Sequence, residues 1–272
     1  MIAVLPIERD QARANNQSNH NTLEETHDQP YAPFRGRRWR HHSCARRLRN
    51  DIIFGRLAPS QKLRLEALKD AYGIGVSTLR ELLNRLTSEG LVIAESARGF
   101  EVAPVSVDNF KELANLRLLL ECHALQRSFA LGDMDWEGRV VAAHHKLSTL
   151  EKRTLAGDKR GLEVLKRYDS EFHQALLSAC GSRVLLDAHA AVFDKYVRYL
   201  MIAVIFREAA PPEHQKLLEC ALRRDAKAAQ AILTTHIMDC VAYTLTNTPA
   251  NLLGLHRLSG KRQSPELAAA PS

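Results

Sequence analysis

Four residues in the second half of the chain, one aspartate and three histidines, have the types and the spacing of a metal site. Asp169 stands where an apolar residue is expected on a helical stripe, and His173 follows one turn later, so we expect both to face the core. His214 and His236 stand in register with neighbouring leucines and should also point inwards. A buried carboxylate is costly unless it is paired or binds a cation. The set therefore suits a divalent transition metal, with zinc (Zn) as the first candidate and nickel, manganese or iron as alternatives.

Each of these residues has a simpler interpretation when it is taken alone. A single histidine on an apolar stripe is more often a hydrogen-bonded core residue than a ligand, and Asp169 could pair with an arginine such as Arg198. The four together favour the metal, and their imidazoles predict that the metal is released as the pH falls. The other histidines, such as His144 and His189, lack a convincing carboxylate at helical spacing, so we interpret them as structural or surface residues.

Two arginines inside apolar runs could bind a carboxylate ligand. Arg117 lies among leucines with Glu121 one turn later, and Arg198 lies between Val197 and Tyr199. A guanidinium group can hold a carboxylate through two parallel hydrogen bonds. An internal salt bridge between Arg117 and Glu121 explains the first arginine equally well.

The elements that must position these residues are helices. From Asp108, the expected N-cap, apolar residues recur at spacings of three and four. The first inward stripe is expected to comprise Leu113, Leu116, Leu120 and Leu125 and to end near Gly132. Further helices are expected at about 136–157, 158–180, 182–207, 212–222 and 225–245. The pattern predicts an antiparallel bundle whose interior can house a ligand or a metal.

A DNA-reading unit is predicted upstream, over residues 63–92. A short amphipathic helix ends at Gly73, which tolerates positive φ, and a second helix with a polar outer face follows. Short hydrogen-bonding side chains and guanidinium groups on that face can contact phosphates and base edges. The side chains expected to contact DNA there are Ser77, Thr78, Arg80, Asn84 and Arg85.

A hairpin is expected directly after the second of these helices. Residues 92–104 alternate around Arg98 and Gly99, which suits a two-stranded hairpin with a basic tip. Together with an earlier helix that ends near Gly55, these elements predict a winged helix-turn-helix whose wing places Arg98 at a minor groove or on phosphate. An ordinary surface hairpin is the alternative.

Length and charge fit two domains and a polyanionic partner. The chain has 272 residues and a net charge of +7, with seven arginines and no acidic residue between Arg35 and Arg49. That run could contact DNA or merely form a solvated basic tail. Five cysteines without a Cys-x-x-Cys pair argue for a reducing compartment. No segment has the apolar length of a signal peptide or a membrane span, so we expect a cytoplasmic protein without a membrane partner.

The predicted fold class is mainly α, in four parts. Residues 1–40 are expected to form a disordered arm, 41–105 a winged helix-turn-helix DNA-binding domain, 106–246 an all-helical antiparallel bundle for metal and effector binding and dimerisation, and 247–272 a flexible tail.

Motifs in both halves give the chain a family resemblance. The upstream motifs are LRNDIIFGRLAPSQKL, YGIGVSTLRELLNRLTSEGLV and RGFEVAPVS, and the downstream ones are NLRLLLE, YDSEFH and the EH to HI spacing. From about residue 43 to 245 the chain resembles the GntR superfamily of bacterial transcription regulators, specifically the FadR-type branch with an all-helical FCD effector domain. Within that branch it resembles the group exemplified by the carbon-starvation regulator CsiR.

The resemblance implies roles for individual residues. It implies that the metal ligands are Asp169, His173, His214 and His236, and that the effector cavity is lined by Arg117 and Arg198. It also implies that Ser77, Thr78 and Arg80 occupy reading positions and that Gly99 is the wing glycine. Val76 and Thr78 depart from residues common in the family, so the family's operator preference does not carry over.

These features predict a dimeric one-component transcription regulator. Two winged domains would bind successive half-sites of double-stranded operator DNA, and a small carboxylate bound in the bundle would bias their spacing. A helical-bundle metallohydrolase fused to a basic module is the main alternative, and a nonspecific DNA-packaging protein is another. The lack of a further carboxylate placed as a general base argues against the hydrolase.

Overall fold

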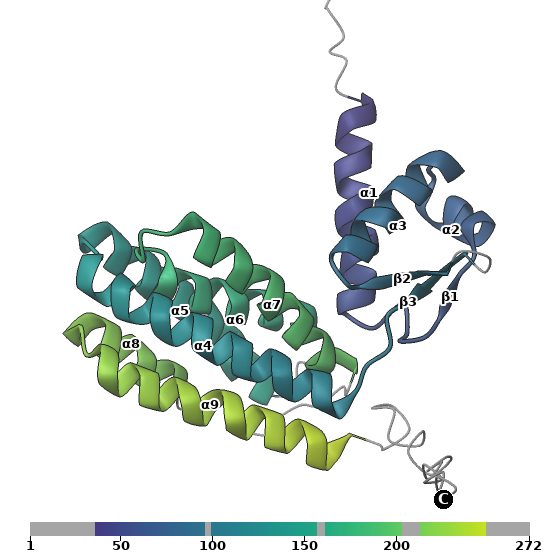
Figure 1. Cartoon of the computed structure of the whole chain (residues 1–272). Coiled ribbons are helices and arrows are strands. Elements are labelled where there is room, and N and C mark those ends of the chain that lie inside the picture. Colours follow the sequence, from purple (N-terminus) through teal and green to yellow (C-terminus); the bar gives the residue numbers. More distant parts are fainter. Residues whose placement is uncertain (1–35, 96–98, 157–160, 203–212, 249–272) are drawn as a thin grey trace, which may run out of the picture.

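The computed structural model of the protein describes residues 36–95, 99–156, 161–202 and 213–248, and it is mainly α, as predicted (Figure 1). A small N-terminal domain with a three-stranded sheet precedes a larger helical bundle. Most of the predicted arm, the wing residue Arg98 and nearly all of the predicted tail lie outside the described residues.

The N-terminal domain is a winged helix-turn-helix, as predicted. Its elements are α1 (Gly36–Ile53), β1 (Lys62–Leu63), α2 (Leu65–Tyr72), α3 (Val76–Ser88), β2 (Val92–Glu95) and β3 (Gly99–Val102). Gly73 ends α2 in the left-handed conformation, with a φ of 64° that glycine adopts without strain. Helix α1 begins at Gly36, within the segment 1–40 that we predicted as an arm, so helical structure starts earlier than expected.

The sheet of this domain has one more strand than the predicted hairpin. Strand β3 lies in the middle and pairs antiparallel with β2 on one side and β1 on the other, where Leu63 lies opposite Phe100. The two-stranded hairpin of the prediction corresponds to β2 and β3. Strand β1 was not predicted because two residues are too few to show an alternating pattern.

The apolar core of the N-terminal domain extends into the bundle. The cluster includes Leu48, Ile52, Leu79 and Leu83 of the N-terminal domain, and Phe193, Val197 and Met201 of helix α7 (Arg183–Ile202). Two ion pairs run along the same junction, since Arg49 Nε lies 2.7 Å from Glu89 Oε2 and Arg49 Nη1 lies 2.6 Å from Asp194 Oδ2 of α7. Helix α7 is therefore part of the core of the N-terminal domain.

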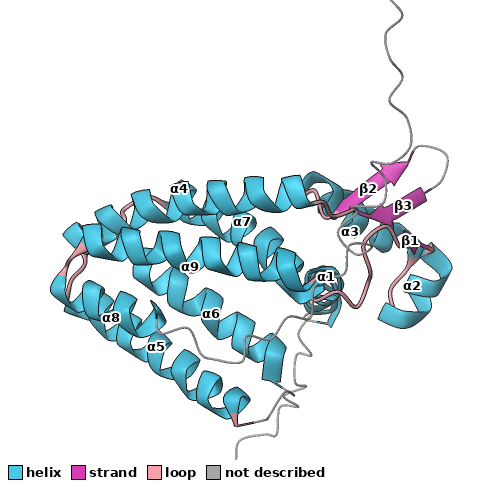
Figure 2. Ribbon diagram, turned by 90° about the horizontal axis from the view of Figure 1, so that it is seen from below, coloured by secondary structure: helices cyan, strands magenta, loops and turns pink. Residues whose placement is uncertain are grey.

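The C-terminal part is an all-helical bundle, as predicted. Its helices are α4 (Val107–Leu131), α5 (Met134–Leu155), α6 (Leu162–Leu177), α7, α8 (Glu213–Arg223) and α9 (Ala226–Asn247). Helix α4 packs against both α7 and α9, and α5 packs against α6 and α8 (Figure 2). Each helix in the described part of the chain is too short or too polar to serve as a membrane span.

Helix α4 begins at a different cap from the one predicted. Ser106, rather than Asp108, is the N-cap, and its hydroxyl accepts a hydrogen bond from the backbone N–H of Asn109. Asp108 lies in the first turn instead, where its negative charge still complements the helix dipole. The prediction was wrong by two positions because serine and aspartate are equally good caps.

The buried face of α4 also differs from the predicted stripe of leucines. Leu125 is buried, but Leu116 is 45% exposed. Arg117 and Glu121, both at most 2% exposed, lie on the inward face. The helix is apolar on more than one side, so periodicity alone could not identify the side that faces the core.

Candidate metal centre

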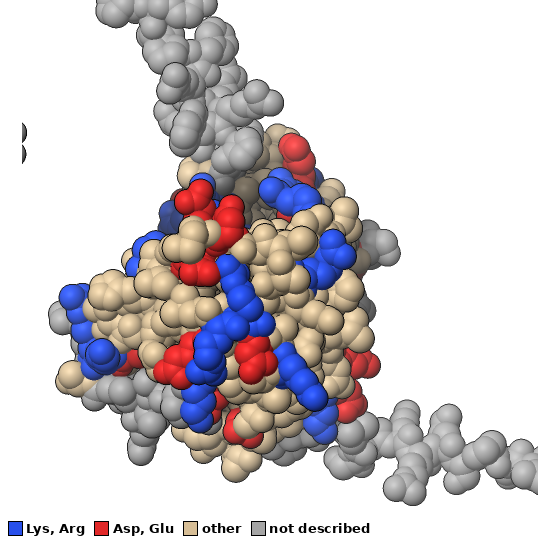
Figure 3. Space-filling model, turned by 90° about the vertical axis from the view of Figure 1, so that its left-hand side faces the viewer, with Lys and Arg blue, Asp and Glu red and all other residues tan. Residues whose placement is uncertain are grey.

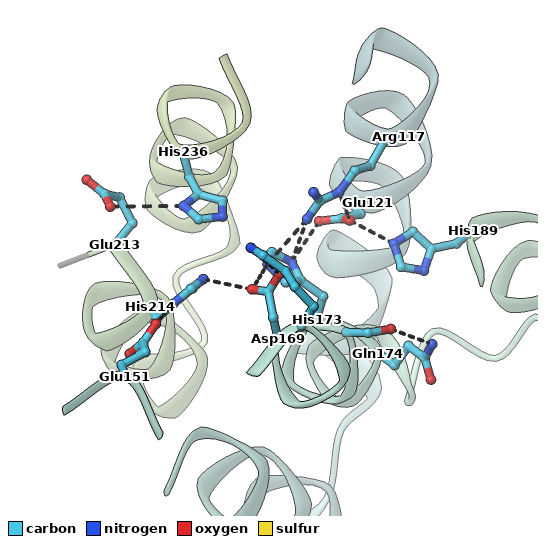
Figure 4. A network of polar contacts seen from close by, with 12 residues as sticks. Arg117, Glu121, Glu151, Asp169, His173, Gln174, His189, Glu213, His214 and His236 are labelled. Carbon is cyan, nitrogen blue, oxygen red and sulfur yellow. Dashed lines mark hydrogen bonds and ion pairs between the residues drawn. The ribbon is translucent and has the colours of Figure 1, made fainter. Parts of the chain in front are cut away.

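The predicted metal ligands converge inside the bundle. Asp169 and His173 come from α6, His214 from α8 and His236 from α9, and all four are buried. Each offers one ligand atom, and these four atoms lie within 4.8 Å of one another (Figure 4). The fold thus assembles the group that the metal prediction requires from residues up to 67 positions apart in sequence, the span from 169 to 236.

The ring nitrogens around Asp169 have the orientation expected of ligands. Nε2 of His214 lies 3.3 Å from Asp169 Oδ1, and Nε2 of His173 lies 3.8 Å from the same oxygen. Nε2 of His214 is also buried without a hydrogen-bond partner. A buried polar atom left in this way is costly, and a cation between the carboxylate and the imidazoles would satisfy it. The donor set therefore fits a divalent metal.

Three glutamates that the sequence interpretation did not assign to the site lie behind the three histidines (Figure 4). Oε2 of Glu121 on α4 lies 3.0 Å from Nδ1 of His173. The other two contacts run from Glu151 Oε1 to His214 Nδ1, at 2.7 Å, and from Glu213 Oε2 to His236 Nδ1, at 4.0 Å. Glu151 and His214 are 63 residues apart, so no local spacing could have paired them.

Burial and charge shift the pKa values in the cluster in different directions. Burial acts to raise the pKa of Asp169, but Lys166 and the neighbouring His214 outweigh it and hold that pKa well below its ordinary value. Burial lowers the pKa of His236 to about 3. For His214 burial acts in the same direction, but the neighbouring carboxylates of Asp169 and Glu151 prevail and raise its pKa to about 9. In the metal-free protein His214 therefore carries the proton that compensates Asp169.

Arg117, one of the two predicted effector contacts, lies beside the cluster. Its Nε donates to Glu121 Oε1 at 2.6 Å, which is the internal salt bridge that we named as an alternative. Its Nη2 lies 3.2 Å from Nδ1 of His173, and its guanidinium carbon lies 4.3 Å from the ring centre of Phe193. His189, interpreted as structural or surface, is buried and holds the same Glu121 through Nε2 at 2.7 Å.

Arg198, the other predicted effector contact, is directed elsewhere. It is buried, and its Nη2 donates to the backbone carbonyl of Ala103, in the segment that joins the two domains. Burial lowers its pKa. The alternative pairing of Asp169 with Arg198 is also not what the structure shows, because Lys166 Nζ is the cation beside that carboxylate, at 3.6 Å from Oδ2. Position in an apolar run indicated that Arg198 is buried but not what it contacts.

The predicted DNA-reading side chains lie on the outer face of α3. Ser77, Arg80 and Asn84 are exposed, Thr78 is half-buried, and Arg85 is exposed with its Nε 3.7 Å from Glu89 Oε1. Gly99 begins β3 with a φ of 90°. By contrast, the end of the bundle that lies away from α3 mixes basic and acidic side chains without a field of one sign (Figure 3). The outer face of α3 is therefore available to a polyanion.

Comparison with protein families gives two matches that together cover both parts of the chain. Residues 42–102 match the family described as bacterial regulatory proteins, gntR family. Residues 112–239 match the FCD domain. The first range covers the winged helix-turn-helix, and the second contains all four residues of the metal cluster.

Curated relatives and solved structures agree with these matches. The chain is 36% identical to the HTH-type transcriptional regulator BphR of Paraburkholderia xenovorans over 72% of this chain and 81% of the relative. It is 32% identical to the HTH-type transcriptional repressor GlaR of Escherichia coli over 70% and 89% respectively. A GntR transcriptional regulator from Rhodococcus sp. RHA1 shares the fold, with a TM-score of 0.64 and 23% identity over 78% of this chain and all of that one. The relatives are named as regulators and not as enzymes, so the hydrolase alternative is set aside.

Proposed function

This chain belongs to the GntR family of bacterial transcription regulators and carries an FCD domain, and on that premise we propose that it binds operator DNA as a homodimer under the control of a small carboxylate. The effector would bind beside a divalent metal held by Asp169, His173, His214 and His236, with zinc as the first candidate. As a DNA-binding regulator it would act in the cytoplasm, and the relation to GlaR favours repression.

The observation that carries this proposal is the position of Phe193 on α7. Its side chain is fully buried and belongs to the apolar cluster that forms the core of the N-terminal domain. The centre of its ring also lies 5.5 Å from that of the His173 imidazole, and Arg117 stacks on it. A single rigid side chain thus packs near His173 of the metal cluster and belongs to the apolar core of the DNA-binding domain.

A carboxylate effector has two charge partners at this position. A divalent metal would offer a Lewis-acidic ligand position, and the Arg117 guanidinium lies against the ring of His173. Because Glu121 already neutralises Arg117, an acid that binds there must compete with that pair or add to it. Either change displaces Arg117 relative to Phe193, which gives the ligand different affinities for two arrangements of α7.

Exposed apolar side chains on α4 and α7 support dimerisation. These two helices pack against each other within the bundle. Leu116 and Leu119 of α4 are 45% and 67% exposed, and Val184 of α7 is 81% exposed. Large apolar side chains that gather on neighbouring helices commonly mark an interaction surface. A second copy of the same face would cover them with two-fold symmetry. The paired α3 helices would then read two half-sites about one turn of DNA apart.

A gel-shift series on the DNA upstream of the gene tests the proposal. We expect a discrete shift with the wild type, a weaker one with Arg80→Ala, and a change on adding a small mono- or dicarboxylate only when the protein is metal-loaded. Phe193→Leu should keep DNA binding and lose the response to the acid. If no acid changes the shift and Arg80→Ala behaves like the wild type, the proposed function is wrong.

A further inference from the structure

We propose that Glu121, Glu151 and Glu213 are positioning residues for the metal, each holding one ligand histidine from behind. This inference rests on the proposed metal site and goes beyond it, because it concerns residues that do not touch the ion. Glu121 and Glu151 would each accept the Nδ1–H of their histidine and so leave Nε2 of that ring as the ligand atom. Glu213, at 4.0 Å from Nδ1 of His236, would act on that ring through its charge.

The three glutamates come from three different helices, yet each meets a different histidine of the cluster at the same ring atom. Glu121 lies on α4, Glu151 on α5 and Glu213 at the start of α8. All three contacts run from a carboxylate oxygen to Nδ1. A common demand on the imidazoles, that Nε2 be left for the ion, accounts for the choice of Nδ1 in all three contacts.

The opposite sides of two of the three rings, those of His173 and His214, agree with this assignment. A neutral imidazole carries one N–H, so a carboxylate at Nδ1 fixes the tautomer in which Nε2 has a free lone pair. Nε2 of His173 and of His214 are the ring atoms that face Asp169 Oδ1. Asp169, His173 and His214 therefore direct their ligand atoms towards one another. The glutamates lie at the Nδ1 side of the two rings, away from these ligand atoms.

The three glutamate–histidine contacts differ in length and burial, so the three glutamates should differ in their effect on metal binding. Glu121 and Glu151 lie within hydrogen-bond distance of their histidines, at 3.0 and 2.7 Å, and their side chains are 1% and 11% exposed. Glu213 is 4.0 Å from His236 and 17% exposed. Glu121 also holds Arg117 and His189, so its removal disturbs more than His173. Glu151 is therefore the residue on which to test the proposal.

The test measures the zinc dissociation constant of the full-length protein by competition with a chromophoric chelator. Glu151→Ala should weaken zinc binding about 10- to 100-fold, as the loss of a residue that orients a ligand does. Glu151→Gln keeps an acceptor for Nδ1–H without the charge, so its loss should be smaller. Glu213→Ala should lose least, because its contact is the longest.

Glu137→Ala is the matched control. Glu137 lies on the same helix as Glu151, is 24% exposed and pairs with Arg224 at 2.6 Å rather than with a histidine. Its loss should leave the zinc dissociation constant unchanged. The visible spectrum of the cobalt-loaded protein provides a second measurement, which should change in Glu151→Ala and not in Glu137→Ala.

The outcomes separate this inference from the proposed metal site. If the wild type binds zinc and Glu151→Ala binds it equally tightly with the same cobalt spectrum, the positioning role is wrong while the metal site stands. If the wild type binds no zinc, nickel, manganese or iron, the metal site is wrong and the positioning role falls with it. Should Glu151→Ala fail to fold, the comparison of Glu151→Gln with Glu137→Gln decides in the same way.

Discussion

Helix α3 carries its candidate functional side chains on its exposed face, whereas α6 carries Asp169 and His173 on its buried face. On α3 the leucines at 79 and 83 are buried, while Arg80 and Asn84 face the solvent. On α6 Asp169 and His173 are buried together with Phe172 and Leu176. An outward polar group keeps its water until a partner replaces it, but an inward one needs a partner within the fold. The difference separates the surface proposed to bind DNA, which is exposed on one helix, from the proposed metal site, which several helices must assemble.

The largest expected effect comes from removing a partner inside the bundle. Glu121→Ala leaves the buried guanidinium of Arg117 without its carboxylate, and we expect a loss of about 3–5 kcal/mol in the free energy of unfolding. Urea denaturation measures it. The double variant Arg117→Met with Glu121→Leu removes both charges and should be more stable than Glu121→Ala alone. Equal stability of Glu121→Ala and the wild type would contradict the view that inward charges depend on their partners.

A pair of adjacent substitutions on α3 separates its two faces. Leu79→Ala opens a cavity at a fully buried position and should lower the free energy of unfolding by about 2–5 kcal/mol. Arg80→Ala, on the exposed side, should change it by less than about 0.5 kcal/mol. It should instead weaken DNA binding and, if it contacts phosphate, reduce the salt dependence by about one unit of slope. A strongly destabilised Arg80→Ala would show that the outer face of α3 has a structural role.

Metal loading should stabilise the wild type and not a ligand variant. At a zinc concentration of about 100 times the dissociation constant, binding to the folded state alone adds about 2.7 kcal/mol. Asp169→Ala removes the carboxylate that faces Nε2 of His173 and His214, so most of this gain should be lost. Thermal unfolding with and without a chelator measures the difference, and elemental analysis gives the metal content. Full metal content in Asp169→Ala would remove Asp169 from the ligand set.

The smallest expected effect is the pH dependence of metal affinity. Burial lowers the pKa of His214, but the neighbouring carboxylates of Asp169 and Glu151 outweigh burial and raise that pKa to about 9, so its proton is bound in the metal-free protein at neutral pH. A metal must displace that proton, and affinity should therefore rise with pH up to about 9, by at most about tenfold per unit for one proton. Zinc competition between pH 6.5 and 8 measures the slope. A flat profile would show that His214 is unprotonated before metal arrives.

The comparison of α3 with α6 also explains where prediction from sequence succeeded. The winged helix-turn-helix, the Gly73 turn and the order of the bundle helices follow from local periodicity, because outward polar and inward apolar residues alternate at the helical repeat. Asp169 and His173 were found by the same rule, as polar residues that break an apolar stripe. A polar residue at a position where the helical repeat requires an apolar one indicated a buried polar group.

Prediction was wrong or incomplete where the buried face of a helix, or the partner of a side chain, depends on residues distant in sequence. The apolar residues of α4 do not say which side meets α7 and α9, and the charged side with Arg117 and Glu121 is the buried one. Arg198 is buried as expected, but its partner is the Ala103 carbonyl, 95 residues away. Glu151 looks like any surface acid until α8 brings His214 against it.

The sequence by itself determined the helices, the two-part order and four residues with the chemistry of a metal site, since each of these depends on spacing along one chain segment. Only the tertiary structure decided that the four meet, that a glutamate lies beside Nδ1 of each histidine, and that Phe193 packs near His173 within the core of the N-terminal domain. The physical reason is that each buried polar residue loses its own hydration, and this cost can be foreseen from its place on an apolar stripe. The partner that offsets the cost comes from another helix, and only the fold shows which one.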